Sequence, residues 1–107
     1  MKPSDFLKRG WCQGRFIDEH YNVCFVGGVQ EAAFLSAHRL TIELDKFDPH
    51  REEYRYKFCD KAAELLGLAA SKGWDAIRAM EAWNDLPERT QEEVIALAER
   101  VEEALGL

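Results

Sequence analysis

The sequence predicts a mainly α-helical fold: a single compact domain over residues 1–107, with about four main helices, a short N-terminal helix and a small irregular or β-like segment. Apolar residues recur at helical spacing in several stretches, helix-starting residues precede these stretches, and glycines follow them. A chain of 107 residues, 47% of them hydrophobic, has the size of one ordinary domain and can bury one modest core.

The first 26 residues predict a short helix followed by irregular chain. Ser4 is a candidate cap for a helix over residues 5–9, and Gly10 stands where a left-handed helix stop is expected. Residues 11–17 then read as extended chain, followed by a polar turn over 18–22 and a short apolar run over 23–26. Two interpretations remain for that run, since it forms either a small hairpin with the preceding segment or the start of the next helix.

From Phe25 onward the spacing of apolar residues is helical; the stripe contains Phe25, Val29, Ala32, Ala33 and residues 35–37. Gly27 and Gly28 each cost roughly 1 kcal/mol relative to alanine inside a helix. They indicate either the close approach of another group or a frayed first turn. Residues 38–47 alternate in polarity, and of the two alternatives, a brief strand or the tail of this helix, we favour helix continuation.

Later helices carry clearer signals. Asp48-Pro49 predicts a helix start, and Gly73 separates this helix from the next. The apolar stripe of the first contains Phe58, Ala62, Leu65, Leu66 and Ala69, and that of the second contains Trp74, Ile77, Met80 and Trp83. Thr90 and Glu93 form a capping box for the last helix, and Gly106 is its stop. Its core positions are Val94, Leu97, Ala98, Val101 and Leu105.

The charge of the chain bears on its partners and location. Twenty acidic and fourteen basic residues give a net charge of -6, which argues against direct nucleic-acid binding and permits binding to a basic protein surface. The neighbouring glutamates at 52–53, 92–93 and 102–103 diverge on a helix and are expected on a solvated face. No apolar run is long enough to span a bilayer, and the N-terminus lacks a signal peptide, so we expect a cytoplasmic protein without membrane contact.

The cysteines permit one catalytic hypothesis. Cys24 lies near an expected helix N-terminus, where amide groups stabilise a thiolate, and His20 precedes it by four residues. The alternative is that Cys24 is a packed core thiol, which we favour. A metal set of Cys12, His20, Cys24 and Cys59 lacks the closely spaced cysteine pairs of structural zinc sites, so we expect no metal and no cofactor.

The polar residues around two tryptophans form the main candidate binding site, composed of Trp11, Gln13, Trp83, Asn84, Asp85 and Arg89. If Trp11 packs against Trp83, these groups gather at one corner, and Asp85 pairs with Arg9 or Arg89. The alternative is a structural latch made of helix-end and turn residues, which we favour over a ligand pocket. Tyr54 and Tyr56 lie among basic residues and predict an amphipathic surface band.

Three stretches resemble a known family: Arg9-Gly10-Trp11-Cys12-Gln13-Gly14, then Cys24-Phe25-Val26-Gly27-Gly28, then residues 83–94, which read WNDLPERTQEEV. They are similar to an uncharacterised domain-of-unknown-function family of small bacterial and bacteriophage proteins with the patterns R-G-W-x-Q-G, C-x-x-G-A and W-N-D-x-P-x-R-T-x-E-E-V. Gly28 departs from the alanine of the second pattern. The resemblance implies a bacterial or phage origin and a compact fold, and it implies no reaction or ligand.

Together these observations predict a small, acidic, non-catalytic binding or regulatory protein associated with phages or mobile elements, acting through contact with a protein partner. Inhibition of a host defence or nucleic-acid-processing complex is one narrower form of this hypothesis. The alternative is a cysteine-dependent enzyme that uses Cys24 with a histidine. A third hypothesis places a small-ligand pocket at the corner formed by Trp11, Trp83, Asn84 and Asp85.

Overall fold

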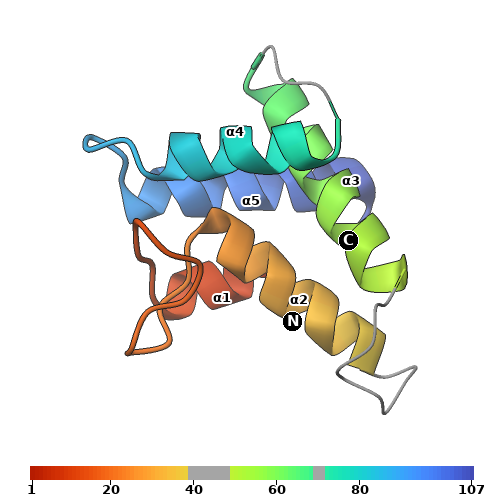
Figure 1. Cartoon of the computed structure of the whole chain (residues 1–107), viewed down its shortest axis with the longest axis horizontal. Coiled ribbons are helices and arrows are strands. Elements are labelled where there is room, and N and C mark those ends of the chain that lie inside the picture. Colours follow the sequence, from red (N-terminus) through yellow and green to blue (C-terminus); the bar gives the residue numbers. More distant parts are fainter. Residues whose placement is uncertain (39–48, 69–71) are drawn as a thin grey trace.

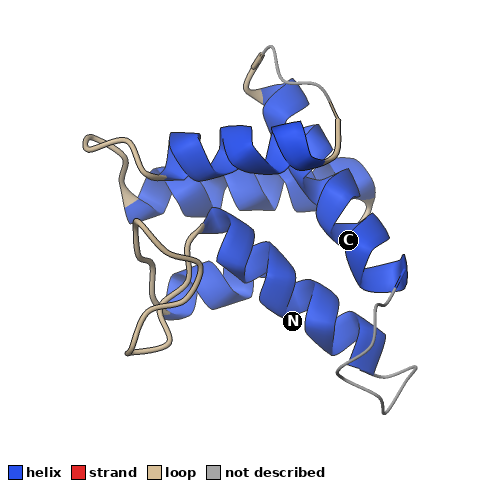
Figure 2. Cartoon of the chain, in the orientation of Figure 1, coloured by secondary structure: helices blue, strands red, loops and turns tan. Residues whose placement is uncertain are grey.

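The computed structural model describes residues 1–38, 49–68 and 72–107, and these residues form five helices (Figures 1 and 2). The helices are α1 (Pro3–Arg9), α2 (Phe25–His38), α3 (Pro49–Leu65), α4 (Trp74–Asn84) and α5 (Gln91–Leu105). The mainly α prediction, with one short N-terminal helix and four longer ones, is confirmed. None of the helices in the described ranges combines the length and the apolar character needed to cross a membrane.

The five helices enclose one core. Helix α2 packs on α1 and α3, α4 packs on α3 and α2, and α5 packs on α1 and α3 (Figure 1). Every helix contributes a fully buried side chain to this core, among them Leu7, Phe25, Phe58, Met80 and Val101. Each helix packs on at least two others, so its apolar face is buried by side chains from several helices.

Helix α1 begins earlier than the sequence predicts. It starts at Pro3, whose fixed φ suits the first helical position, so Ser4 lies inside the helix and is not its cap. The carboxylate of Asp5 accepts a hydrogen bond from the backbone N–H of Lys2 at 2.8 Å. Ser4 is instead buried and donates to Glu102 of α5, with the backbone N–H at 2.8 Å and the hydroxyl at 2.7 Å.

Those two hydrogen bonds correct a second prediction. Glu102 was expected on a solvated face with Glu103, but it is 4% exposed and holds the N-terminal turn of α1. The Glu102 carboxylate accepts a hydrogen bond from the backbone N–H of Ser4, a first-turn amide that has no partner within the helix. Glu103 is exposed, as expected.

Gly10 ends α1 in a way that the sequence did not predict. Its φ of 168° is extended backbone, and the expected left-handed stop is therefore wrong. A Cβ atom at this position would collide with the side chain of Asn22, which crosses the segment here. Contact with the Asn22 side chain, and not a left-handed turn, favours glycine here.

The run over residues 23–26 enters helix α2, which begins at Phe25. The hairpin alternative is not what forms here. Val23 makes only isolated β-bridges, to Trp11 and to Ile17. A Cβ on Gly27 would collide with the carbonyl oxygen of Phe16, and one on Gly28 would lie 3.3 Å from the carbonyl oxygen of Pro3. Close approach of another backbone segment therefore explains Gly27, whereas a Cβ at Gly28 would be only slightly crowded.

Helices α3 and α4 follow the sequence with one exception. Helix α3 begins at Pro49 and α4 follows Gly73, as predicted. Trp74 was expected in the apolar stripe of α4 but is 56% exposed, because Ala76, Ile77 and Met80 form the buried face. The predictions for residues 39–48 and for Ala69 lie outside the described residues.

Helix α5 has the predicted boundaries. The Thr90 hydroxyl accepts from the Glu93 N–H at 3.2 Å, and the Glu93 carboxylate accepts from the Thr90 N–H at 3.2 Å, which completes the capping box. Gly106 adopts the left-handed conformation with φ 72°. The predicted core positions Val94, Leu97, Ala98 and Val101 are buried, and Leu105 packs at the edge of the core.

Candidate functional site

The predicted corner exists at one end of the molecule, where the loop over residues 10–24 meets the turn after α4 (Figure 1). Asn84, the last residue of α4, lies at its centre and is 0% exposed. We call Trp11, Gln13, Asn84 and Asp85 the Asn84 cluster, because hydrogen bonds join the other three residues to Asn84.

The side chain of Asn84 makes four hydrogen bonds. Its Oδ1 accepts from the indole Nε1 of Trp11 at 2.8 Å and from the backbone N–H of Phe25 at 3.0 Å. Its Nδ2 donates to the carbonyl oxygen of Cys12 at 3.2 Å and to Oδ1 of Asp85 at 3.0 Å. An amide side chain has two donor hydrogens and two acceptor lone pairs, so no capacity remains for a ligand.

The remaining members of the cluster also bind backbone. Nε2 of Gln13 donates to the carbonyl oxygens of Asn84 at 2.9 Å and Leu86 at 2.8 Å. Oδ1 of Asp85 accepts from the N–H of Gly14 at 3.0 Å. These contacts fasten the N-terminal loop to the end of α4 and to the first residue of α2, which supports the latch alternative over the ligand pocket.

Trp83 and Arg89 lie beside the cluster and contact each other. The guanidinium of Arg89 lies 4.1 Å above the Trp83 ring, and its Nε donates to the Trp83 carbonyl oxygen at 3.0 Å. Trp83 also packs edge-on against Phe25, with ring centroids 6.2 Å apart. The two tryptophan segments therefore meet as predicted, but they meet through Asn84 and the N-terminus of α2.

The predicted pairing of Asp85 with an arginine is wrong. Arg89 pairs with Glu93 at 2.8 Å, and Arg9 lies over the ring of Phe6 at 5.8 Å. Asp85 accepts from neutral N–H groups in their place. The contacts of both arginines are with residues near them in the chain, which require less ordering of the long side chain than a pair between distant segments.

Cys24 immediately precedes α2, as the catalytic hypothesis requires, but it is only 3% exposed. Its sulfur accepts from the backbone N–H of Gly27 at 3.3 Å, so the thiol acts as a helix cap. Burial raises the pKa of Cys24 to about 11, although the N–H groups of Gly27 and Val26 act in the opposite direction. The thiol is therefore protonated at neutral pH.

His20 does not lie in a protected site. Its side chain is 78% exposed and its Nε2 is 3.8 Å from a carboxylate oxygen of Glu19. Cys59, the third cysteine, is fully buried in α3, and burial raises its pKa to about 12. Among the residues that the structure describes, no three histidine, cysteine, aspartate or glutamate side chains are grouped to hold a metal ion.

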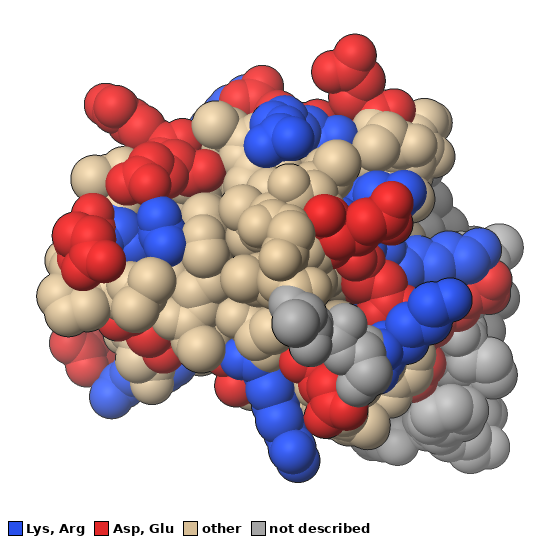
Figure 3. Space-filling model, turned by 90° about the horizontal axis from the view of Figure 1, so that it is seen from above, with Lys and Arg blue, Asp and Glu red and all other residues tan. Residues whose placement is uncertain are grey.

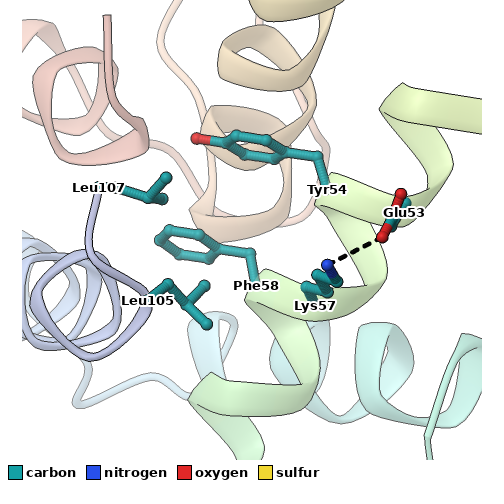
Figure 4. Close-up of a pocket in the computed structure, with 6 residues that line it drawn as sticks. All are labelled: Glu53, Tyr54, Lys57, Phe58, Leu105 and Leu107. Atoms are coloured by element: carbon teal, nitrogen blue, oxygen red, sulfur yellow. Dashed lines mark ion pairs between the residues drawn. The ribbon is translucent and has the colours of Figure 1, made fainter.

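Two of the cavities in the described part of the chain involve residues that the sequence analysis singled out. One, of about 260 Å³, lies beside the Asn84 cluster and is lined by Arg15, Phe16, Cys24, Glu81 and Asp85, among others. The other, of about 300 Å³, lies between α3 and the end of α5. Figure 4 shows Tyr54, Phe58, Leu105 and Leu107 around it, with the ion pair of Lys57 and Glu53 at one side. Tyr54, assigned to a surface band, stacks on Phe58 with centroids 6.3 Å apart.

A shallow groove of about 580 Å³ runs along the outer face of α4. We call it the α4 groove, and its apolar lining is Leu68, Ala79, Ala82, Trp83 and Leu86. Leu68 and Leu86 are 36% and 41% exposed. The sequence contained a partial signal for it, since Ala79, Ala82 and Trp83 have the i, i+3, i+4 spacing of one helix face.

Comparison with known proteins agrees with the resemblance seen in the sequence. A family model described as a family of unknown function, DUF6197, matches residues 5–104. No curated protein and no solved structure matches the chain.

Proposed function

The chain belongs to DUF6197, a family of unknown function, and we propose that it is a non-catalytic binding or regulatory protein that acts by contact with another protein. The α4 groove is the observation that carries the proposal. Exposed, contiguous apolar surface on a small, highly charged domain is the usual mark of an interaction site. Tryptophan and arginine dominate the energetics of such interfaces, and Trp83 lines the groove with Arg89 stacked on it.

The other candidate sites favour structural roles. The Asn84 side chain has no hydrogen-bonding capacity left for a substrate. The Cys24 thiol has its pKa raised to about 11 by burial, whereas a cysteine nucleophile needs a lowered pKa and access to its substrate. The α4 groove is open to solvent, and most of its lining is apolar.

A narrower form of the proposal concerns biological context. An association with phages or mobile elements is motivated by the small size, the net charge of -6 and the sequence resemblance to small bacterial and bacteriophage proteins. Inhibition of a bacterial defence or nucleic-acid-processing complex is one regulatory role for such a protein. Its net negative charge disfavours direct contact with nucleic acid and leaves contact with a basic protein surface open.

The experiment compares two exposed alanines. An affinity-tagged protein is expressed in a bacterial host with an untagged copy, and co-purified proteins are quantified by mass spectrometry. We expect a stoichiometric partner that is retained by Ala96→Glu, on the outer face of α5, and lost with Ala82→Glu in the α4 groove. Equal recovery with both variants, or no partner in any of several hosts, contradicts the proposal.

A further inference from the structure

Two aromatic rings of α3 face each other at the cavity between α3 and the end of α5. Tyr54 and Phe58 lie four residues apart, on the same side of the helix. Their rings are nearly parallel, with 6° between the planes, and the ring centroids are 6.3 Å apart. Figure 4 shows the Tyr54 ring above the Phe58 ring, with Leu107 at one end of the space between them and α3 at the other. We call this space the ring slot, and both of its rings line the cavity of about 300 Å³.

The spacing of the two rings favours a flat occupant. Carbon atoms in van der Waals contact lie about 3.5 Å apart, so a flat group that touches both rings needs about 7 Å between them. The ring slot is within about 1 Å of that width, whereas a tetrahedral group such as a quaternary ammonium is thicker and needs a wider space. Phe58 is fully buried in the core, while Tyr54 is partly exposed, so Tyr54 is the ring that can move to widen the slot.

The electrostatics of the ring slot favour a cation over an anion. The face of an aromatic ring is the negative part of its quadrupole, and two such faces are turned toward one space here. Burial, and then the negative charge of Glu102, raise the pKa of Tyr54 to about 12, so the ring lies in the field of a carboxylate. The hydrogen bonds of Glu102 with Ser4 leave its charge in place, because Ser4 is neutral. Lys57, the basic residue of the cavity lining, is paired with Glu53 at 2.8 Å.

The charge of the whole chain acts in the same direction over a longer range. Figure 3 shows acidic groups spread among basic ones over one face of the molecule. A net charge of -6 raises the local concentration of cations around the protein. This attraction is not directed at any one place on the surface, so the two parallel rings are the feature that holds a cation at a defined position.

We propose that the ring slot binds a small planar cation, an amidinium or a guanidinium group, between the faces of Tyr54 and Phe58. Such groups stack on aromatic faces, and they are more weakly hydrated than an ammonium, so they lose less on leaving water. A cavity of about 300 Å³ is at the lower end of the range for small-molecule sites and fits a compact ligand. The site shares no lining residue with the α4 groove, and the inference is independent of the proposed function.

The test is a titration of the purified full chain, followed by NMR of its leucine methyl groups. Benzamidine is the planar cation, benzoate is its anionic counterpart, and tetramethylammonium is a cation that is not flat. We expect benzamidine to bind with a dissociation constant on the order of 1 mM and to shift the methyl signals of Leu105 and Leu107. Benzoate and tetramethylammonium should bind at least about tenfold more weakly, and the methyl signals of Leu86 in the α4 groove should not move.

Three variants of α3 test the part played by the rings. Tyr54→Leu removes one wall of the slot and should weaken benzamidine binding by about tenfold or more. Tyr54→Phe keeps the ring and loses only the hydroxyl, so its affinity should stay within about twofold. Tyr56→Leu makes the same aromatic-to-aliphatic change outside the slot and should leave binding unchanged. Circular dichroism verifies that each variant retains its helices, and if Tyr54→Leu does not fold, the three probes still decide the question on the unaltered chain.

The same planar cation occurs in free small molecules and in the arginine side chains of proteins. N-acetylarginine N-methylamide presents the group as a protein does, so tighter binding of this compound than of benzamidine assigns the slot to an arginine of another protein. Tighter binding of benzamidine assigns it to a free aromatic cation.

Four results overturn the inference. They are benzamidine that shifts no methyl signal, benzoate or tetramethylammonium that binds as tightly as benzamidine, unchanged binding by Tyr54→Leu, and shifts at Leu86 in place of Leu105 and Leu107. None of these results bears on the α4 groove variants, so failure of this inference and failure of the proposed function are separate observations.

Discussion

The indole Nε1 of Trp11 donates a 2.8 Å hydrogen bond to Oδ1 of Asn84, which joins residues 73 positions apart. The same oxygen accepts the first amide of α2, that of Phe25. One buried side chain thus fixes the N-terminal loop, caps one helix and ends another. This arrangement explains why so many specific polar groups gather near the tryptophans, since they bind one another and the backbone of neighbouring segments.

Replacement of Asn84 by alanine should cost roughly 3 kcal/mol or more of unfolding free energy. The change leaves the buried Phe25 N–H and the part-buried Trp11 indole and Cys12 carbonyl without partners. A fully buried unpaired group costs about 1–3 kcal/mol, and a part-buried one costs less. Gln13→Ala, which removes an exposed side chain, should cost about 1 kcal/mol. Urea denaturation measures both, and a smaller loss for Asn84→Ala than for Gln13→Ala would contradict the central role of Asn84.

The adjacent glycines of α2 should respond differently to alanine. Gly27→Ala is expected to destabilise by roughly 1–3 kcal/mol, because its Cβ meets the fixed carbonyl oxygen of Phe16 and overpacking outweighs the gain in helix propensity. Gly28→Ala meets its nearest atom at 3.3 Å and should be milder. Thermal denaturation measures the loss of stability in each variant. If Gly27→Ala is no more destabilising than Gly28→Ala, the backbone at Phe16 moves away from the added Cβ at little cost.

Glu102→Ala should destabilise by about 3 kcal/mol, since it leaves the buried N–H and hydroxyl of Ser4 without their acceptor. Glu103→Ala is a matched control on the same helix, and because Glu103 is exposed its effect should stay within about 0.5 kcal/mol. Chemical denaturation of the two variants checks the difference. If the two variants have similar free energies of unfolding, the hydrogen bonds between Ser4 and Glu102 make no net contribution to stability.

Cys24 should react slowly with a thiol reagent at neutral pH, and the less buried Cys12 should react first. Burial raises the Cys24 pKa from 9.0 to about 11, so the folded state retains a proton that the unfolded state releases. This stabilisation is complete below pH 9 and is lost as the pH rises through 11. Mass spectrometry of labelled peptides identifies the reacting thiol, and rapid labelling of Cys24 would revive the enzyme hypothesis.

Local signals in the sequence predicted much of the fold. The capping box of Thr90 and Glu93, the start of α3 at Pro49 and the stop at Gly106 depend on residues within one helical turn. Such interactions can be inferred from spacing because their partners are neighbours in the chain. The corner was also predicted in outline, since turn and cap residues cluster near both tryptophans.

Predictions failed where distant segments compete for the same residue. Gly10 was expected to form a left-handed stop, but the side chain of Asn22 requires the space at that position. Glu102 was expected in solvent, but α1 docks over it, and Trp74 was expected in the core, but α4 presents its other face. The pairing of Asp85 failed because the backbone of Gly14 reaches its carboxylate.

By itself the sequence determined the helical class, most helix boundaries and the residues that meet near Asn84, because periodicity, caps and turns are local properties of the chain. The tertiary structure decided what those residues do. It buried Asn84 with all its hydrogen bonds made, sealed the Cys24 thiol and left the α4 groove exposed. Burial and the satisfaction of polar groups depend on segments that are distant in sequence, so only their packing separates a structural latch from a surface available for binding.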